Sequence, residues 1–209
     1  MDEGNHATSG AILKPTTRGE HIAHWISQLG SPPLVALMAL LLTAVTFTLP
    51  GIWMWVGVYV LLAMVVPLIY LIWLVRQGKV ADLDLHLREQ RQGPFIVTLA
   101  GAAAAWGVLT LGGAPQILRL LAAASVAQTL LIFLITLRWK ISVHTSTAAG
   151  MTVLVWSVVG KAAAPLVITI PLIAWSRVKL RRHTFWQTVA GIVLGCLIFL
   201  IAVWLAKGG

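Results

Sequence analysis

The sequence predicts an all-α fold, a polytopic bundle of six to seven membrane-spanning helices with its functional site at one membrane face. Of the 209 residues, 59% are apolar and only 10% are charged, and the mean hydropathy is +0.91, which is far from the values of water-soluble domains. The composition excludes intrinsic disorder and, because Cys196 is the one cysteine, a disulfide framework. No nucleic-acid partner is expected, despite the formal net charge of +9.

Apolar runs that approach the roughly 20 residues needed to cross a bilayer recur along the chain. The predicted spans are seven runs, at about residues 34–49, 52–75, 94–111, 115–137, 146–159, 163–176 and 187–206. Glycine and proline mark tight turns after the first, third and fifth runs, at residues 49–51, 112–115 and 160–165. The fifth and sixth runs are short, so they could also form one kinked helix.

Three longer, charged connections join the remaining runs, at residues 76–93, 138–145 and 177–186. Two spans separate each connection from the next, so all three are predicted to lie on one membrane face, together with the N-terminus. A single kinked helix in place of the fifth and sixth runs would move the third connection to the opposite face. Residues 1–32 are expected to form a polar segment at the membrane interface, and residues 33–209 a single transmembrane domain.

The charges are unevenly distributed, because no Asp or Glu follows Glu89 whereas ten Lys and Arg residues do. Seven of these ten lie in or beside the charged connections. This predicts a basic surface where the three connections meet, here called the mouth, which attracts anions. The same bias is also explained by the positive-inside rule, by which the cytoplasmic loops of membrane proteins carry an excess of Lys and Arg. With the exception of Arg119, Lys161 and Lys207, all Lys and Arg residues lie on the predicted mouth face, so this rule places the site in the cytoplasm.

Two histidines stand at the start of apolar runs, His144 before the fifth and His183 before the seventh. Each is followed by a threonine, Thr145 or Thr184, which is expected to cap the helix. Two helix N-termini that face one mouth would present backbone N–H groups and positive dipole ends, which suit phosphate. One imidazole could attack phosphorus while the other protonates the leaving oxygen. Arginines that can grip phosphate oxygens lie in the same connections: Arg88, Arg91 and Arg177.

The segment from Ser176 to Gly191 resembles the third signature of the type 2 phosphatidic acid phosphatase superfamily. That signature is Ser-Arg, five residues, His, three residues and Asp, and here Ser176-Arg177 is followed after five residues by His183. Residues 141–144, Ile-Ser-Val-His, are similar to the second signature, Pro-Ser-Gly-His. Residues 79–94 resemble the first signature, a Lys followed at a distance by Arg-Pro, only loosely.

The resemblance implies specific roles. His183 would be the nucleophile that becomes phosphorylated, His144 the acid that protonates the leaving group, and Arg177 with Arg91 the clamp on the phosphate oxygens. Further phosphate-binding side chains would be Arg88, Ser142, Lys140 and Lys79. The family uses no metal and no cofactor, because cationic side chains and helix ends stabilise the transition state.

The chain departs from the family pattern at three places. Gln187 replaces the aspartate that orients the nucleophilic imidazole, Val143 replaces the Gly of the second signature, and no Pro follows Arg91. Gln187 lies four residues after His183 and can accept a hydrogen bond from its Nδ1–H. Residues 183–187, His-Thr, two residues and Gln, resemble the corresponding segment of polyprenyl and dolichyl diphosphate phosphatases, where Val follows the Gln, whereas here Thr188 follows it. A prenyl or polyprenyl diphosphate is therefore favoured over phosphatidate as the lipid substrate.

Other interpretations stay open at this stage. A catalytically degenerate scaffold could bind phosphorylated lipid headgroups without cleaving them. Asp82 and Asp84 suggest a magnesium-dependent prenyltransferase, but such enzymes need two Asp-rich motifs and this chain has one. A bis-histidine haem protein conflicts with histidines that precede their helices. The resemblance also implies a site outside the cytoplasm, which conflicts with the positive-inside rule.

Overall fold

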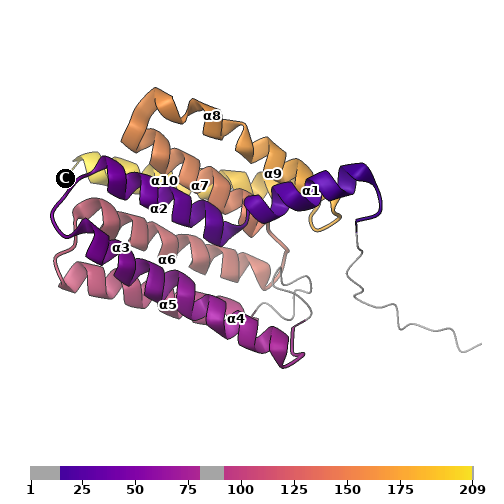
Figure 1. Cartoon of the computed structure of the whole chain (residues 1–209), viewed down its shortest axis with the longest axis horizontal. Helices are drawn as coiled ribbons and strands as arrows, with labels where there is room; N and C mark the ends of the chain where they lie inside the picture. Colours follow the sequence, from indigo (N-terminus) through magenta and orange to yellow (C-terminus); the bar gives the residue numbers. More distant parts are fainter. Residues whose placement is uncertain (1–14, 81–91, 209) are drawn as a thin grey trace, which may run out of the picture.

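The computed structural model describes residues 15–80 and 92–208, and within these ranges the chain forms helices and connecting turns without a strand. The helices run mostly side by side along the long axis of the molecule (Figure 1). Their bounds are α1 Arg18–Leu29, α2 Pro32–Thr46, α3 Ile52–Val60, η1 Leu61–Val65, α4 Val66–Arg76, α5 Gln92–Leu111, α6 Gln116–Thr136, α7 Val143–Val159, η3 Gly160–Ala163, α8 Ala164–Val167, α9 Thr169–Lys179 and α10 Phe185–Gly208.

The predicted all-α membrane bundle is confirmed. Among the described residues, five helices are long and apolar enough to cross a membrane, and the pair α1 and α2, bent by 48°, would make a sixth. The predicted first run extends too far, because α2 ends at Thr46. Pro50 accounts for this difference, since a proline disfavours helical backbone at the residue before it.

Prolines also shape the interior of two spans. Pro67 has no N–H for the helical ladder, and the chain just before it widens into the π-helical turn η1 between α3 and α4. The predicted sixth run is divided at Ile168 into α8 and α9, because Pro171 has no N–H to donate to the carbonyl of Val167. Sequence hydropathy gave no sign of either irregularity because both segments are uniformly apolar.

The chain reverses direction between α7 and α9. Gly160 ends α7 with a positive φ of 60°, a conformation that glycine adopts without steric cost. His144 at the start of α7 lies 3.4 Å from Arg177 at the end of α9, measured from imidazole Nε2 to guanidinium Nη1. These two ends therefore lie on one face, as the seven-run interpretation predicts, and the alternative of a single kinked helix does not fit.

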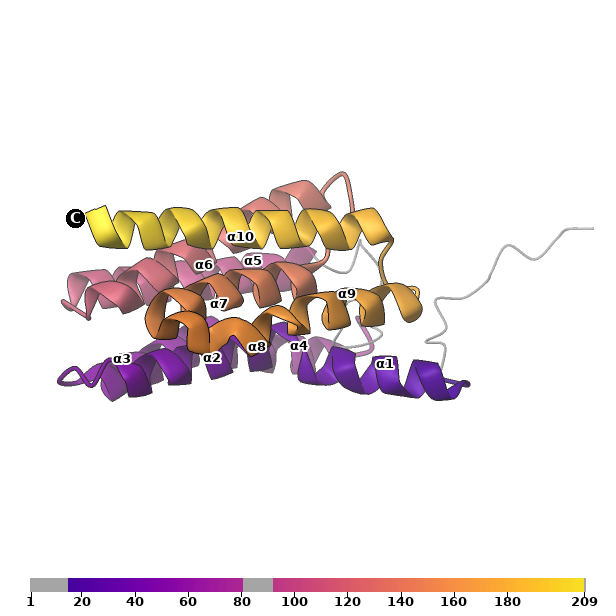
Figure 2. The same cartoon turned by 90° about the horizontal axis from the view of Figure 1, so that it is seen from above.

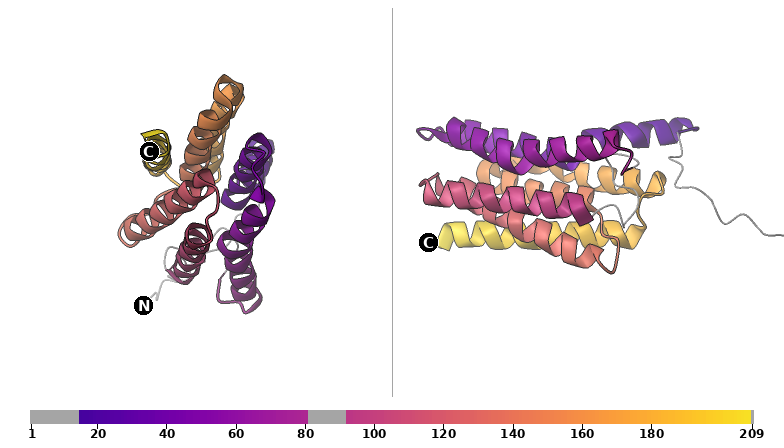
Figure 3. Two further views of the ribbon diagram at one scale, coloured as in Figure 1. Left: turned by 90° about the vertical axis from the view of Figure 1, so that its left-hand side faces the viewer. Right: turned by 90° about the horizontal axis from the view of Figure 1, so that it is seen from below.

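Helix α7 is the central helix of the bundle. It packs against both α10 and α2, and the end-on view places it between them (Figure 3). All residues from 144 to 152 are buried. The view from above shows α10 running along α7 over its whole length (Figure 2). The position of α7 thus fixes the position of His144.

Small residues allow α7 and α10 to approach closely. A Cβ atom at Gly195 would overlap the carbonyl oxygen of Ser146, and one at Gly191 would overlap the hydroxyl of Thr145. Gly191 and Gly195 are four residues apart and so lie on one side of α10, which is the spacing of close-packed membrane helices. This contact brings the first turns of α7 and α10 together.

Helix α1 packs against α9 through one side that carries small residues. Ala23, Ser27 and Gly30 are buried, and a Cβ at Gly30 would lie 2.6 Å from Cγ1 of Ile173. Thr17 and Glu20 form a capping box at its N-terminus. Large apolar side chains point away from this contact and are exposed: Ile22, Trp25 and Leu29.

We expect Gly195→Ala to lower the stability of the bundle by about 2 kcal/mol, because the new methyl group would collide with the backbone of α7. Gly107→Ala is the matched control, since nothing lies within 4 Å of a Cβ at that position of α5, and it should be neutral or stabilising by about 0.5 kcal/mol. Thermal unfolding of the purified protein in one detergent measures both. Equal stability of the two variants would contradict the close contact between α7 and α10.

Candidate functional site

The connection between α9 and α10 is a tight turn that ties His183 to Arg177. The N–H of Arg182 donates to the carbonyl of Arg177 at 3.0 Å, and the N–H of Arg181 donates to the carbonyl of Val178 at 2.9 Å. These two bonds, with Arg181 at φ 54°, form a Schellman motif. The N–H of His183 also donates to the carbonyl of Arg177, at 3.3 Å. The five residues between Arg177 and His183 are therefore the length that this turn requires.

Thr184 and Gln187 form a reciprocal cap at the start of α10. The backbone N–H of Gln187 donates to Thr184 Oγ1 at 3.3 Å, and the backbone N–H of Thr184 donates to Gln187 Oε1 at 3.0 Å. This is a capping box with glutamine in the usual place of glutamate. The prediction that Thr184 caps this helix is confirmed.

The same amide oxygen fixes the tautomer of His183. Gln187 Oε1 lies 3.2 Å from His183 Nδ1, so the contact predicted from the spacing of these residues is present. Because the Thr184 N–H can only donate, its partner on Gln187 must be the oxygen, which can only accept. Nδ1 must then carry a proton to make this bond, and in the neutral imidazole Nε2 holds the lone pair.

Ser142, and not Thr145, caps the start of α7. The Oγ of Ser142 accepts from the backbone N–H of Thr145 at 3.4 Å, and α7 begins one residue after it. The threonine is used differently, since its hydroxyl donates to the carbonyl of Thr188 in α10 at 3.0 Å. The backbone N–H of Ser142 donates to the carbonyl of Gln187 at 3.2 Å. His144 thus lies inside the first turn of α7, and two hydrogen bonds join that turn to α10.

Arg177 connects these elements to α1. Its side chain is only 1% exposed, and its Nη1 donates to the hydroxyl of Ser27 at 2.6 Å. The same Nη1 is 3.4 Å from Nε2 of His144. A guanidinium group can only donate, so His144 Nε2 is the acceptor in this arrangement. A permanently charged group is therefore held where α1, α7 and α9 meet.

The remaining predicted residues are placed as follows. Arg88 and Arg91, with Asp82 and Asp84, lie outside the described residues. Lys79 is exposed, and its Nζ lies 4.9 Å from the ring centroid of Trp73. Lys140 is half-buried in the connection that leads into α7. The structure thus brings together five of the predicted residues, through the side-chain pairs Arg177–His144 and His183–Gln187 and through backbone hydrogen bonds. These five residues are Ser142, His144, Arg177, His183 and Gln187.

Sequence reasoning missed Ser27. No motif marks it, and the sequence predicts for residues 1–32 only a polar segment at the interface. The available signal was the spacing of Ala23, Ser27 and Gly30, which puts three small residues on one side of a helix. That spacing predicts a packing face but does not reveal Arg177 as the partner.

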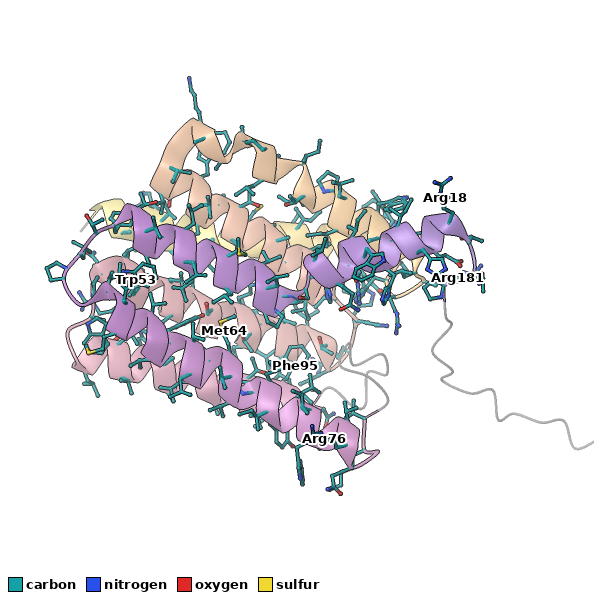
Figure 4. All side chains as sticks on the ribbon, in the orientation of Figure 1. Arg18, Trp53, Met64, Arg76, Phe95 and Arg181 are labelled. Atoms are coloured by element: carbon teal, nitrogen blue, oxygen red, sulfur yellow. The ribbon has the colours of Figure 1, made fainter. Side chains whose placement is uncertain are left out.

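Basic side chains gather at the end of the molecule where the site lies. Arg18, Arg76 and Arg181 lie toward this end, whereas Trp53 lies at the opposite end (Figure 4). Within residues 15–80 and 92–208, no group of three or more His, Cys, Asp or Glu side chains could hold a metal ion.

Comparison of the chain with protein-family models, with curated proteins and with solved structures found no match.

We expect ¹⁵N NMR of histidine-labelled protein to find His183 in the Nδ1–H tautomer, because Gln187 Oε1 accepts that proton. Gln187→Leu should abolish this preference. Thr184→Ala is the control, since it removes the capping hydroxyl but keeps the backbone N–H that orients Gln187, and it should cost about 1 kcal/mol of stability while the tautomer is retained. An Nε2–H signal from His183 in the unsubstituted protein would contradict this assignment.

Proposed function

We propose that this chain is a metal-independent membrane lipid phosphatase that hydrolyses a phosphomonoester or diphosphate of a lipid through a phosphohistidine intermediate. The observation that carries the proposal is the state of His183. Its Nδ1–H is held by Gln187, which leaves the lone pair on Nε2, the nitrogen that would attack phosphorus. The turn before α10 also ties this histidine to the buried Arg177.

The reaction would proceed in two displacements. In the first, Nε2 of His183 bonds to phosphorus, the bond from phosphorus to the lipid-side oxygen breaks, and His144 gives that oxygen a proton. In the second, His144 takes a proton from water, the water oxygen bonds to phosphorus, and the phosphorus–nitrogen bond breaks to release phosphate. The positive end of α10 and the Arg177 guanidinium would stabilise charge on the phosphoryl oxygens.

The resting contact between His144 and Arg177 sets a condition for this mechanism. Nε2 of His144 accepts from Arg177, so it must take up a proton before it can act as the acid. Phosphate oxygens that draw Nη1 of Arg177 away would leave this nitrogen open to protonation. Substrate binding and formation of the acid are therefore coupled in the proposed mechanism.

The lipid nature of the substrate is supported by the location of the site. The site lies at one end of a bundle whose outer surface carries many exposed large apolar side chains, so a phosphate at headgroup depth could reach it while its lipid tail stays in the bilayer. The resemblance of residues 183–187 to polyprenyl diphosphate phosphatases favours a prenyl diphosphate over phosphatidate. Arg88, Arg91, Lys140 and Lys79 are proposed as further ligands of the phosphate.

A degenerate scaffold that binds phosphorylated headgroups is the second candidate. Gln187 favours it, because an uncharged amide stabilises an imidazolium less than a carboxylate would. The capping box also accounts for Thr184 and Gln187 by helix stability alone. Retention of His144 beside Arg177 favours the enzyme, since a binding scaffold does not need an acid.

The deciding experiment is phosphate release by purified, detergent-solubilised protein with EDTA present. Farnesyl diphosphate, geranylgeranyl diphosphate and phosphatidate are the substrates. His183→Ala should abolish release, and His144→Ala should slow it by about 10²- to 10³-fold, because general acid catalysis contributes on that scale. His24→Ala on α1 is the matched control and should keep full activity.

Two results would overturn the proposed enzyme. The first is a folded wild-type protein that releases no phosphate from any of the three lipids, and the second is a His183→Ala variant that remains active. In the active case, the His144→Ala variant should accumulate an acid-labile phosphoenzyme from ³²P-labelled substrate. The additional substitution His183→Ala should remove that label.

We also propose that the site faces the cytoplasm, since Lys and Arg gather at its end of the bundle. Gln77 after α4 and Gln116 at the start of α6 are exposed at opposite ends. In a Cys196→Ala background, an impermeant thiol reagent added to intact cells should label Gln116→Cys and leave Gln77→Cys unlabelled. The reverse pattern would place the site outside the cytoplasm.

A further inference from the structure

We infer that α1 is part of the phosphate site and that Ser27 is a positioning residue for Arg177. This inference rests on the proposed function, because it assigns the means by which Arg177 is held for phosphate. Ser27 is 3% exposed, and its Oγ lies 2.6 Å from Nη1 of Arg177. That separation is short even for a hydrogen bond from a charged nitrogen, whose usual range begins at about 2.7 Å.

The packing of α1 fixes where this hydroxyl lies. Ala23 is fully buried on the same side of the helix, one turn before Ser27. Gly30 follows on that side, and its missing side chain leaves room for Ile173 of α9. The capping box of Thr17 and Glu20 secures the other end of α1. A site residue held by packing in this way can orient its partner within a narrow range.

Ser27 determines the orientation of the guanidinium plane. Nη1 carries two N–H groups, and in the structure it is bonded to Ser27 and to His144. Without the serine hydroxyl, Nη1 would lose the short hydrogen bond that α1 supplies, and the guanidinium plane would be held less firmly. Bidentate recognition of phosphate by arginine depends on that plane. Loss of the hydroxyl should therefore weaken phosphate binding more than it slows the chemical step.

The serine is unlike its neighbour in sequence, Ser31, which provides a control. Ser31 is the N-cap of α2, and its side chain makes no capping hydrogen bond. Ser27→Ala and Ser31→Ala thus make the same chemical change four residues apart, in one case at a hydroxyl bonded to the guanidinium and in the other at a hydroxyl that makes no capping hydrogen bond. Ser27→Thr and Ser27→Val form a second pair that has the same shape and differs only in the hydroxyl.

The experiment measures KM and kcat for the preferred lipid phosphate and the inhibition constant of orthophosphate. We expect Ser27→Ala to raise KM and the orthophosphate constant about tenfold, with kcat changed less than threefold, while Ser31→Ala matches the wild type. Ser27→Val should have a KM and an orthophosphate constant about tenfold above those of Ser27→Thr. This second pair tests the inference even if the alanine variant does not fold. A purely structural role of Ser27 would lower the unfolding temperature without this selective change.

The outcomes separate this inference from the proposed function. If the wild-type protein hydrolyses no lipid phosphate, calorimetric binding of orthophosphate replaces the kinetics, and tenfold weaker binding by Ser27→Ala would uphold the role of Ser27 although the phosphatase proposal fails. Equal KM and equal orthophosphate affinity in Ser27→Ala and wild type would overturn the inference while leaving the phosphatase intact. A wild-type protein that neither hydrolyses the lipids nor binds orthophosphate would overturn both.

Discussion

The burial of the Arg177 guanidinium is the interaction on which the arrangement of this end of the bundle depends. Removing a permanent charge from water costs several kcal/mol unless hydrogen bonds replace the lost hydration. The replacements come from different helices, with Ser27 on α1 and His144 on α7 both bonded to Nη1. Helices α1, α7 and α9 must therefore keep their relative positions so that the buried charge keeps its hydrogen bonds. The Schellman turn after α9 also fixes His183 and the start of α10 relative to Arg177.

Close packing deeper in the bundle supports the same geometry. In a lipid environment no hydrophobic force draws two apolar helices together, so their association depends on close contact and on hydrogen bonds between them. The glycines of α10 permit that contact, and the hydroxyl of Thr145 adds a hydrogen bond to the carbonyl of Thr188. Further down, Gln128 of α6 donates to Ser146 of α7 at 3.0 Å. The polar site thus lies at the end of a well-connected helix pair.

The hydropathy of the sequence and the number of spans between its charged connections predicted most of the helices that position the site. Apolar runs located the helices from α2 onward to within a few residues but did not predict α1. Counting the spans between charged connections placed His144, Arg177 and His183 on one face. The spacing from Arg177 to His183 and from His183 to Gln187 predicted local contacts correctly, because both lie within one turn or one capping box. Short-range geometry of this kind follows from the backbone alone.

Long-range partners could not be predicted in the same way. Ser27 bonds to Arg177 because of how α1 meets α9, and no periodicity in either segment specifies that contact. The choice of Ser142 over Thr145 as the cap depends on where α10 accepts the threonine hydroxyl. The division of the sixth run into α8 and α9 and the π-helical turn before Pro67 likewise reflect local backbone choices within uniformly apolar sequence.

The hydrogen bond between Ser27 and Arg177 joins residues 150 positions apart. A ribosome makes the chain from its N-terminus, so α1 emerges long before α9 exists. During that interval Ser27 lacks the arginine, and α7 and α10 with their histidine-bearing first turns have not yet been made. Assembly of this end of the bundle is therefore a late event in biogenesis, because it requires the hairpin of α7, α8 and α9 to enter the bilayer and bring Arg177 back to α1.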